Sequence, residues 1–407
     1  MNSLNDYADI VGKKYIEQLK KLALTLKKKS VVMVNSTKEG GGVAEILHRL
    51  VPLLNELGIE TEWKIINGNR EFFNITKNIH NALQGQKICF TKEMLDYYLE
   101  INKKNSENFE FNEDFVFIHD PQPLALINYF NKNKSKWIWR CHIDLSKPDL
   151  NLWKFLKQYL LKYDASIFSI AKFSRVLPHP QYLVAPSIDP LSDKNKVLTK
   201  EEIENAISFF QINLDKPIIL QVSRFDRFKG HEGVIKAYRM VKKEINCQLI
   251  LAGGEASDDP EGKAVFEEVL NEAGNDPDIK ILMLKPDSNI EINALQRISD
   301  VIIQNSSKEG FGLVVTEAMW KEKPVIGGAV GGITIQILNH QNGFLIHSID
   351  GAAFRIRYLL NRRHISEKMG KLAKKYVLQN FLITRHLRDY LCIMIALENM
   401  NKNIIYI

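Results

Sequence analysis

Short apolar runs alternate with amphipathic stretches along most of this chain, and this alternation constrains the fold more than any other feature of the sequence. Strands that alternate with helices predict a parallel sheet covered by helices on both faces. Helical periodicity is clearest at Val43–Leu57, Leu124–Phe130 and Leu152–Leu161. The expected strands of the first half are Val31–Val34, Glu62–Ile66, Phe115–Ile118, Trp137–Cys141, Ala165–Ile170 and Tyr182–Val184.

A proline-rich segment then interrupts the alternation. Pro178, Pro180, Pro186 and Pro190 forbid a long helix, because proline lacks an amide donor and clashes with the preceding turn. The segment is therefore typical of a linker between domains. Beyond it the alternation restarts, with expected strands at Ile218–Val222, Gln248–Ala252, Ile279–Leu284, Val301–Gln304, Pro324–Ile326 and Phe344–Ile346.

These patterns predict an α/β protein with two Rossmann-like, doubly wound parallel-sheet domains that face a central cleft. A chain of 407 residues is long enough for both. We place the first domain at residues 1–190, with a helical leader at 1–29, and the second at residues 191–379. A last helix within 380–407 is expected to pack back on the first domain. Such sheets bind ligands at the carboxyl ends of their strands, so a ligand site between the domains is expected.

Composition and charge exclude several classes of protein. Apolar residues make up 45% and charged residues 25% of the chain, which is ordinary for a globular protein and excludes a disordered or polytopic membrane protein. The net charge is only +7, too little for a dedicated nucleic-acid-binding face. The N-terminus lacks the apolar core of a signal peptide, and the four cysteines form no C-x-x-C pair. We therefore expect a cytoplasmic protein with no disulfide framework, no stable insertion into a membrane and no nucleic-acid partner.

Two loops that follow expected strands carry candidate phosphate ligands. The run Gly40–Gly42 opens a helix, where free amides favour an anion, although a tight turn would explain the glycines equally well. Arg224 and Lys229 lie just past the strand Ile218–Val222, where a guanidinium and an ammonium can hold a diphosphate. A charged surface turn is the alternative for this pair.

A third loop favours a binding function more strongly. Glu309 lies in a Glu-Gly-Phe-Gly run after the strand Val301–Gln304, and Glu317 follows eight positions later in the next helix. This spacing lets one carboxylate reach sugar hydroxyls while the other reaches a ribose, and amides at the helix start can contact phosphate. The glycines of Gly327–Gly332 are a weaker candidate for a backbone-lined ligand loop. A dehydrogenase cofactor loop is the rival interpretation, but the run lies late in the second half and lacks an acidic residue about twenty positions on at a strand end.

Two loops of the first half bring histidines and aspartates to adjacent strand ends. His119 and Asp120 end one strand, and Arg140, His142 and Asp144 lie at the end of the next. Two histidines and two aspartates at adjacent strand ends favour a polar site. They could also bind a metal ion, but no H-x-x-x-H or similar local spacing supports one, and we assign no metal-binding residue.

Together these motifs resemble the retaining, nucleotide-sugar-dependent glycosyltransferases of the GT-B fold, and more closely the trehalose glycosyltransferring synthases of glycosyltransferase family 4. The broader resemblance rests on Ser223–Gly230, Gly40–Glu45 and the E-x7-E spacing within Glu309–Ala318. The closer one covers nearly the whole chain, through Val34–Glu45, His119–Pro123, Arg140–Asp144, Pro186–Asn195, Ala256–Gly262, Glu309–Gly328 and Asn380–Leu391.

The resemblance implies a role for each matching residue. Arg224 and Lys229 would hold the donor diphosphate without a metal ion, and Glu309 would bind hydroxyls of the transferred glucose. His142 would lie near the reacting centre and complete the implied catalytic set, while Glu317 would bind the ribose. The other implied positions are Gly41, Gly42, Gly312, Leu313 and Val314 for the donor, and Asp120, Gln122, Arg140 and Asp144 for the acceptor.

The implied activity is the reversible, retaining transfer of glucose from ADP- or UDP-glucose to free glucose, which forms trehalose and requires no cofactor. Because no carboxylate must act as a nucleophile, we hypothesise front-face transfer in which the departing diphosphate accepts the acceptor's proton. Another acceptor, a trehalose phosphorylase and a non-catalytic sugar or nucleotide sensor are the alternatives. Departures from the family pattern at His231, Lys285 and Ala329 leave the donor base open. The expected partners are small sugars and the nucleotide-sugar, and the oligomeric state, a homodimer included, stays open.

Overall fold

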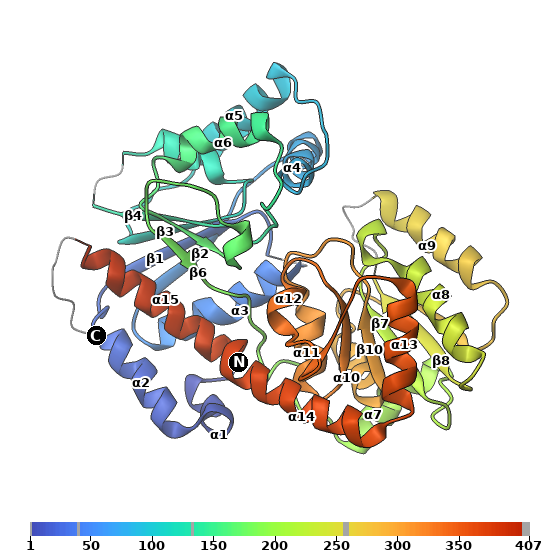
Figure 1. Cartoon of the computed structure of the whole chain (residues 1–407). Helices are drawn as coiled ribbons and strands as arrows, with labels where there is room; N and C mark the ends of the chain where they lie inside the picture. Colours follow the sequence, from blue (N-terminus) through green and yellow to red (C-terminus); the bar gives the residue numbers. More distant parts are fainter. Residues whose placement is uncertain (1, 39–40, 132–133, 255–259, 401–407) are drawn as a thin grey trace. The chain divides into compact units, whose positions relative to one another are not determined.

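The computed structural model describes residues 2–38, 41–131, 134–254 and 260–400 of the chain. Contacts between Cα atoms divide the chain into two units (Figure 1). Unit 1 comprises the chain up to Pro186 together with the segment from Ile383 onward, and unit 2 comprises Ser187–Leu382. The chain thus leaves unit 1 within the proline-rich segment and returns to it just before the last helix.

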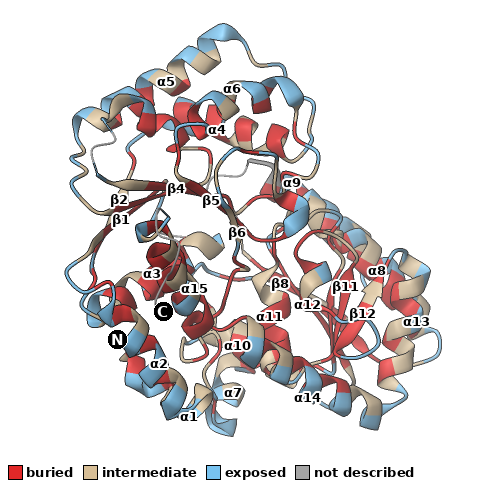
Figure 2. Ribbon diagram, turned by 60° about the vertical axis from the view of Figure 1, so that its left-hand side comes forward, coloured by how far each residue is buried: buried red, intermediate tan, exposed pale blue. Residues whose placement is uncertain are grey.

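Unit 1 is built on a six-stranded parallel sheet with the strand order β2-β1-β3-β4-β5-β6. All residues of β3 and β5 are buried, as expected for parallel strands covered on both faces (Figure 2). The strands are β1 (Ser30–Asn35), β2 (Glu60–Ile65), β3 (Phe115–His119), β4 (Lys136–Arg140), β5 (Ala165–Phe168) and β6 (Gln181–Leu183).

One of the expected helices of unit 1 is of a different type. The expected helix Leu124–Phe130 is a 3-10 helix, because the amides of Leu124 and Leu126 bond to the carbonyls of Pro121 and Pro123, three residues back. The helices are η1 (Leu4–Tyr7), α1 (Ala8–Val11), α2 (Lys13–Leu24), α3 (Gly41–Glu56), α4 (Arg70–Leu83), α5 (Lys92–Glu107), η2 (Leu124–Tyr129), α6 (Leu150–Leu160), η3 (Ala171–Phe173) and α15 (Ile383–Glu398).

The last helix of the chain lies in unit 1. Helix α15 packs against α2 of the leader and against α3 (Figure 1, red against blue). Arg385 attaches it to the end of the β6 segment, since its guanidinium donates to the carbonyls of Ala185 at 2.7 Å and Pro186 at 3.1 Å. Residues from the two ends of the chain therefore share one core.

Unit 2 repeats the architecture with a parallel sheet of order β12-β11-β10-β7-β8-β9. Its strands are β7 (Ile218–Val222), β8 (Gln248–Gly253), β9 (Ile279–Met283), β10 (Val301–Gln304), β11 (Val325–Gly328) and β12 (Gly343–Ile346). Its helices are α7 (Lys200–Ile207), η4 (Ser208–Phe210), η5 (Arg227–Lys229), α8 (His231–Lys242), α9 (Pro260–Ala273), α10 (Asn289–Ile298), α11 (Leu313–Trp320), α12 (Ile333–Gln336), α13 (Ile349–Leu360) and α14 (Arg363–Asn380).

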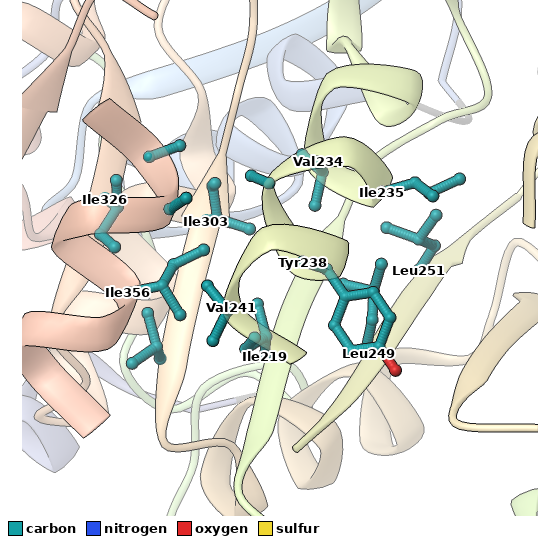
Figure 3. Packing of buried hydrophobic residues seen from close by; sticks show 14 of the residues in the cluster. Ile219, Val234, Ile235, Tyr238, Val241, Leu249, Leu251, Ile303, Ile326 and Ile356 are labelled. Atoms are coloured by element: carbon teal, nitrogen blue, oxygen red, sulfur yellow. The ribbon is translucent and has the colours of Figure 1, made fainter. Parts of the chain in front are cut away.

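The core of unit 2 forms where α8 and α13 cover the sheet. Val234, Tyr238 and Val241 recur at helical spacing on α8 and meet strand residues such as Ile219 and Leu249 (Figure 3). All five side chains are buried. This core holds α8 firmly, and α8 begins directly after the loop that carries Lys229.

Both sheets have a topological switch point, where connections leave two neighbouring strands in opposite directions. In unit 1 it lies between β1 and β3, and in unit 2 it lies between β7 and β10. Ligands of doubly wound sheets bind outside the carboxyl ends of the strands at such points. In the described part of the chain, no helix combines the length and apolar character needed to cross a membrane.

Candidate functional site

The loops after β7 and β10 lie side by side at the switch point of unit 2. The carbonyl of Phe228 accepts from the amide of Ser307 at 2.8 Å, and the carbonyl of Gly230 accepts from the side chain of Asn305 at 3.2 Å. Gly230 has a φ of 65°, and an added Cβ would lie 2.3 Å from the carbonyl oxygen of Asn305. Only glycine therefore allows the two loops to approach this closely.

This approach brings together Lys229 and Glu309, two of the residues implied in catalysis. The ammonium of Lys229 lies 2.7 Å from Oε2 of Glu309, and the hydroxyl of Ser306 donates to the same oxygen at 3.2 Å. The two side chains are only 15% and 12% exposed. A cation and a carboxylate are thus held together at the carboxyl edge of the sheet.

Arg224 is not part of this contact. Its side chain is 58% exposed, and its guanidinium lies 3.8 Å from Oδ2 of Asp226. Asp226 in turn accepts from the amide of Phe228 at 2.7 Å and so caps the short helix η5. Arg224 is therefore a surface cation beside the Lys229 loop, with freedom to turn toward an anion.

Glycines shape the loop that carries Glu309. Gly312 has a φ of 83° and forms the N-cap of α11, so the amides of Leu313 and Val314 open the helix without intrahelical acceptors. Gly331 has a φ of 46°, and a Cβ there would lie 1.7 Å from the carbonyl oxygen of Glu309. The Gly327–Gly332 run, a weak ligand candidate in the sequence, thus supports the Glu309 backbone.

Glu317 lies in α11 and is 2% exposed. Its Oε1 is 3.9 Å from the ammonium of Lys194, and its backbone carbonyl accepts from Lys321 at 3.2 Å. Lys321 also donates to Oδ1 of Asn195 at 3.0 Å. Burial lowers the pKa of Lys321 to about 7, although the charge of Glu317 acts in the opposite direction.

Lys194 reaches Glu317 because helix α10 holds its segment in place. Asn293 donates to the carbonyls of Asp193 and Lys196, and Arg297 donates to the carbonyl of Lys196 at 2.8 Å. Lys194 was not among the site residues predicted from the sequence. Its place in the Pro186–Asn195 run of family resemblance was the available signal.

In unit 1 the structure gathers polar side chains at the ends of β3 and β4. Nδ1 of His119 and Nε2 of His142 are 3.0 Å apart, the ring centroids are 5.3 Å apart, and the two ring planes are nearly parallel, at an angle of 14°. Oδ1 of Asp120 accepts from the amide of His142 at 2.8 Å. Burial raises the pKa of Asp120 to about 6, despite this hydrogen bond and the charge of Arg140.

The backbone of Asp120 is strained, which is common at functional sites. Its φ is 64°, in the left-handed region that side chains other than glycine rarely adopt. Its carbonyl oxygen accepts from the indole of Trp139 at 3.0 Å, which helps to hold this conformation. The strain turns the chain so that the carboxyl group reaches the neighbouring β4 loop.

The other residues assigned to the acceptor differ in accessibility. Arg140 is fully enclosed and donates to the carbonyl of Val184 at 2.8 Å, so in this conformation it supports the loop from inside. The carbonyl of Gln122 accepts from Asn102 at 3.1 Å, and Oδ1 of Asp144 accepts from the amide of Ser146 at 2.8 Å. Gln122 and Asp144 are both partly exposed.

Helix α15 adds residues that the sequence analysis did not assign to the site. His386 is buried and stacks on Tyr390, which stacks on Phe117 of β3. Burial, together with the charges of Arg385 and Arg140, lowers the pKa of His386 well below its usual value. The run Asn380–Leu391 in the family resemblance was the signal that these residues matter.

Two glycine positions of the donor set lie in unit 1. Gly41 has a φ of 78° and begins α3, followed by Gly42. Asn35, at the end of β1, donates to the carbonyl of Thr37 and accepts from the indole of Trp63, which fixes the approach to this turn. Gly40 lies outside the described residues, as does most of the Ala256–Gly262 run.

A cavity of about 910 Å³ opens beside the Lys229 loop in unit 2. Gly230, His231, Asn305, Gly328 and His347 contribute to its lining, together with residues of α9 and α13. Its volume is in the range of small-molecule sites. Among the described residues, no group of three or more His, Cys, Asp or Glu side chains is arranged to hold a metal ion.

The fold and these loops define the class of the protein. The chain aligns with the sucrose-phosphate synthase of Thermosynechococcus elongatus with a TM-score of 0.70 and 18% identity, over 91% of this chain and 100% of that one. Residues 202–376 match the family model "Glycosyl transferases group 1". The protein is a GT-B glycosyltransferase.

The particular family follows from closer relatives. Residues 33–175 match the model "Trehalose synthase, N-terminal domain". The trehalose synthase of Thermococcus litoralis is 50% identical over 394 residues, which cover 95% of each chain. The chain therefore belongs to the trehalose synthase family. A trehalose phosphorylase of Pleurotus pulmonarius is 28% identical, over 93% of this chain and 58% of that protein.

Proposed function

We propose that this glycosyltransferase moves glucose from ADP- or UDP-glucose to free glucose, with retention at the anomeric carbon, and so forms trehalose reversibly. The contact between Lys229 and Glu309 carries the proposal, because it pairs a cation for a diphosphate with a carboxylate for sugar hydroxyls. Trehalose synthases that align along 95% of the chain support the choice of acceptor and product.

In this proposal unit 2 holds the nucleotide-sugar. The ammonium of Lys229 has three donors, so it can bind a phosphate oxygen while it keeps its contact with Glu309. The exposed guanidinium of Arg224 turns toward the same diphosphate. The opening amides of α11, from Leu313 and Val314, face the anion in the way helix N-termini do.

The chemical step then depends on charge that develops on the leaving group. As the bond between the anomeric carbon and the diphosphate breaks, negative charge grows on the phosphate oxygen, and Lys229 and Arg224 stabilise it. These two cations supply the charge that a metal ion would otherwise provide, so the proposal includes no cofactor. A phosphate oxygen accepts the proton of the acceptor hydroxyl as that hydroxyl attacks the same face of the sugar.

The acceptor is assigned to unit 1 with His142 and Asp120 at the reacting end. His142 is partly exposed, and Asp120 is held against its backbone amide. Gln122 and Asp144 are the other partly exposed polar residues of these two loops. They offer hydrogen bonds to the hydroxyls of a monosaccharide, which is the chemistry that a glucose acceptor requires.

A product assay tests the proposal. The purified chain is incubated with ¹³C-glucose and, in separate reactions, with ADP-, UDP- or GDP-glucose, and the disaccharide is identified by NMR from its anomeric signals. We expect α,α-trehalose with ADP- or UDP-glucose, and no loss of rate with EDTA. Absence of any disaccharide with all donors, or a product that is not α,α-linked, would contradict the proposal.

A matched set of variants links the activity to the site. Lys229→Ala and Glu309→Gln are expected to lower kcat by about 10²–10³-fold with little change in thermal unfolding. Arg363→Ala is the control, since Arg363 is an exposed arginine of unit 2 that is paired with Glu367 on the surface of α14. Full activity of both site variants would refute the assignment.

A trehalose phosphorylase is the second candidate, supported by the relative from Pleurotus pulmonarius. In that case inorganic phosphate would take the place of the nucleoside diphosphate. Incubation of trehalose with phosphate, and separately with ADP or UDP, distinguishes the two. Formation of glucose 1-phosphate without nucleotide would favour the phosphorylase, whereas consumption of trehalose only with nucleotide favours the synthase.

A further inference from the structure

The paired histidines of unit 1 lie close enough for one hydrogen bond between their rings. His119 is 1% exposed, and burial lowers its pKa to about 3, with the charge of Arg140 acting in the same direction. Burial also lowers the pKa of His142 well below its usual value. Both rings are therefore neutral near pH 7, and only one hydrogen can lie between Nδ1 of His119 and Nε2 of His142, which are 3.0 Å apart.

Two arrangements of that proton are chemically distinct. If His119 carries it on Nδ1, then Nε2 of His142 is an acceptor and His142 carries its own hydrogen on Nδ1. If His142 carries the proton on Nε2 instead, then Nδ1 of His142 has a free lone pair and can act as a base. Nδ1 of His142 is the ring nitrogen that a ligand could contact, because no described residue is hydrogen-bonded to it.

The surroundings of His119 decide between the two. Its other nitrogen, Nε2, is buried and has no hydrogen-bond partner among the described residues. The charge that acts on His119 comes from Arg140, which is fully buried and whose guanidinium offers only donors. A hydrogen on Nε2 of His119 would leave an orphaned donor near this cation, whereas a lone pair complements the cation.

No neighbouring group reverses this preference. The titratable groups that act on the pair are Arg140, Asp120 and His386. His386 is kept neutral by burial, and Oδ1 of Asp120 is bound to the amide of His142. The positive charge of Arg140 therefore dominates the electrostatic environment of His119.

We propose that His119 is a positioning residue that holds His142 in the Nδ1–H tautomer, so that His142 presents a hydrogen-bond donor to the glucosyl donor. The identity of that ligand rests on the proposed function. In this tautomer His142 can donate to an oxygen of the sugar or its leaving group, but it cannot accept the proton of the attacking hydroxyl. That proton has to leave by another route, and the departing diphosphate is the available base.

Neutron crystallography of the perdeuterated, full-length protein near pH 7 tests the tautomer directly and needs no variant. We expect deuterium on Nδ1 of His119 and on Nδ1 of His142, with none on Nε2 of His142. Deuterium on Nε2 of His142, whether alone or as part of a doubly protonated ring, would overturn the proposal.

Variants of His119 connect the tautomer to the reaction. Asn places an amide N–H close to the position of Nδ1, so His119→Asn keeps the donor, whereas His119→Leu removes it. We expect His119→Leu to lower kcat about tenfold, as for the loss of one hydrogen bond in the transition state, with a smaller change in the donor KM. His119→Asn should recover most of that loss. Equal losses in both variants would contradict the proposal.

One control variant is needed, and the possible results distinguish failure of the proposed function from failure of the tautomer. His179→Asn is the matched control. His179 is hydrogen-bonded to Ser166 near the amino end of β5, whereas His119 lies at the carboxyl end of β3 in the same sheet. We expect wild-type kcat for it. If no donor gives a disaccharide, the proposed function fails, while the neutron result still decides the tautomer. If trehalose forms and deuterium lies on Nε2 of His142, the inference fails and the function stands.

Discussion

Replacement of Gly331 by alanine should inactivate the enzyme through the backbone of Glu309. A Cβ at residue 331 would lie 1.7 Å from the carbonyl oxygen of Glu309 and 2.8 Å from its carbonyl carbon. To restore even a close contact of 3.0 Å, that carbonyl has to retreat by roughly 1.3 Å. Because the same residue carries the carboxylate that meets Lys229, the displacement moves the site itself.

Two effects of Gly331→Ala can be separated by magnitude. The φ of 46° costs an alanine about 1 kcal/mol. The collision adds about 1–3 kcal/mol, as overpacking does in a rigid surrounding. The displacement of Glu309 by about an ångström should lower kcat/KM about 100-fold, because catalysis is that sensitive to the placement of reacting groups.

Gly274→Ala isolates the first effect. Gly274 has a φ of 62°, and nothing lies within 4 Å of a Cβ placed there. Thermal unfolding and transfer kinetics are measured for both variants. We expect Gly274→Ala to lose stability and keep its activity, and Gly331→Ala to lose more stability and most of its activity. If Gly331→Ala matches Gly274→Ala in both measurements, the argument that Gly331 supports Glu309 is wrong.

The remaining predictions concern lysines of unit 2. Lys229→Ala should abolish protection of the protein by ADP or UDP against thermal unfolding, because the diphosphate loses its enclosed cation, and unchanged protection would refute this. Lys194→Met should raise the donor KM about tenfold with a smaller effect on kcat, since Lys194 positions Glu317. Lys196→Met is the surface control and should leave the donor KM unchanged. Equal KM values for the two variants would count against the contact between Lys194 and Glu317. Lys321 has a pKa lowered to about 7, so its folded form binds fewer protons than its unfolded form above pH 7. The unfavourable contribution of Lys321 to the free energy of unfolding is therefore full below pH 7 and fades toward pH 10.5, so this free energy should rise over the interval. Lys321→Met should remove that rise, which is measured by urea titration at each pH.

The loops after β7 and β10 show how much of the site could be predicted from the sequence. Arg224, Lys229 and Glu309 were predicted because each follows an apolar run that had to be a strand. The contact between Lys229 and Glu309 spans 80 positions of sequence, and it depends on β7 and β10 being neighbours. Alternation of strands and helices predicts a parallel sheet but does not specify the order of the strands.

Helices with a weaker signal were harder to predict. Helices α4 and α5 begin at capping residues, Asn69 and Thr91, whose side chains accept from amides three positions on. Their apolar stripes are diluted by polar residues, and Asn102 and Asn105 of α5 are buried. These asparagines donate to backbone carbonyls of Gln122 and Asn67, which a pattern of hydrophobicity cannot show.

The sequence by itself determined the two α/β units, the loops that carry the charged residues and, through its resemblance to a family, the class of reaction. Those properties follow from local periodicity and from short motifs. The tertiary structure decided which residues share a site: Lys194 with Glu317, His119 with His142, and Arg385 with a carbonyl 200 positions away. Such contacts depend on strand order and burial, because a side chain's charge and tautomer depend on neighbours in space that are distant in sequence.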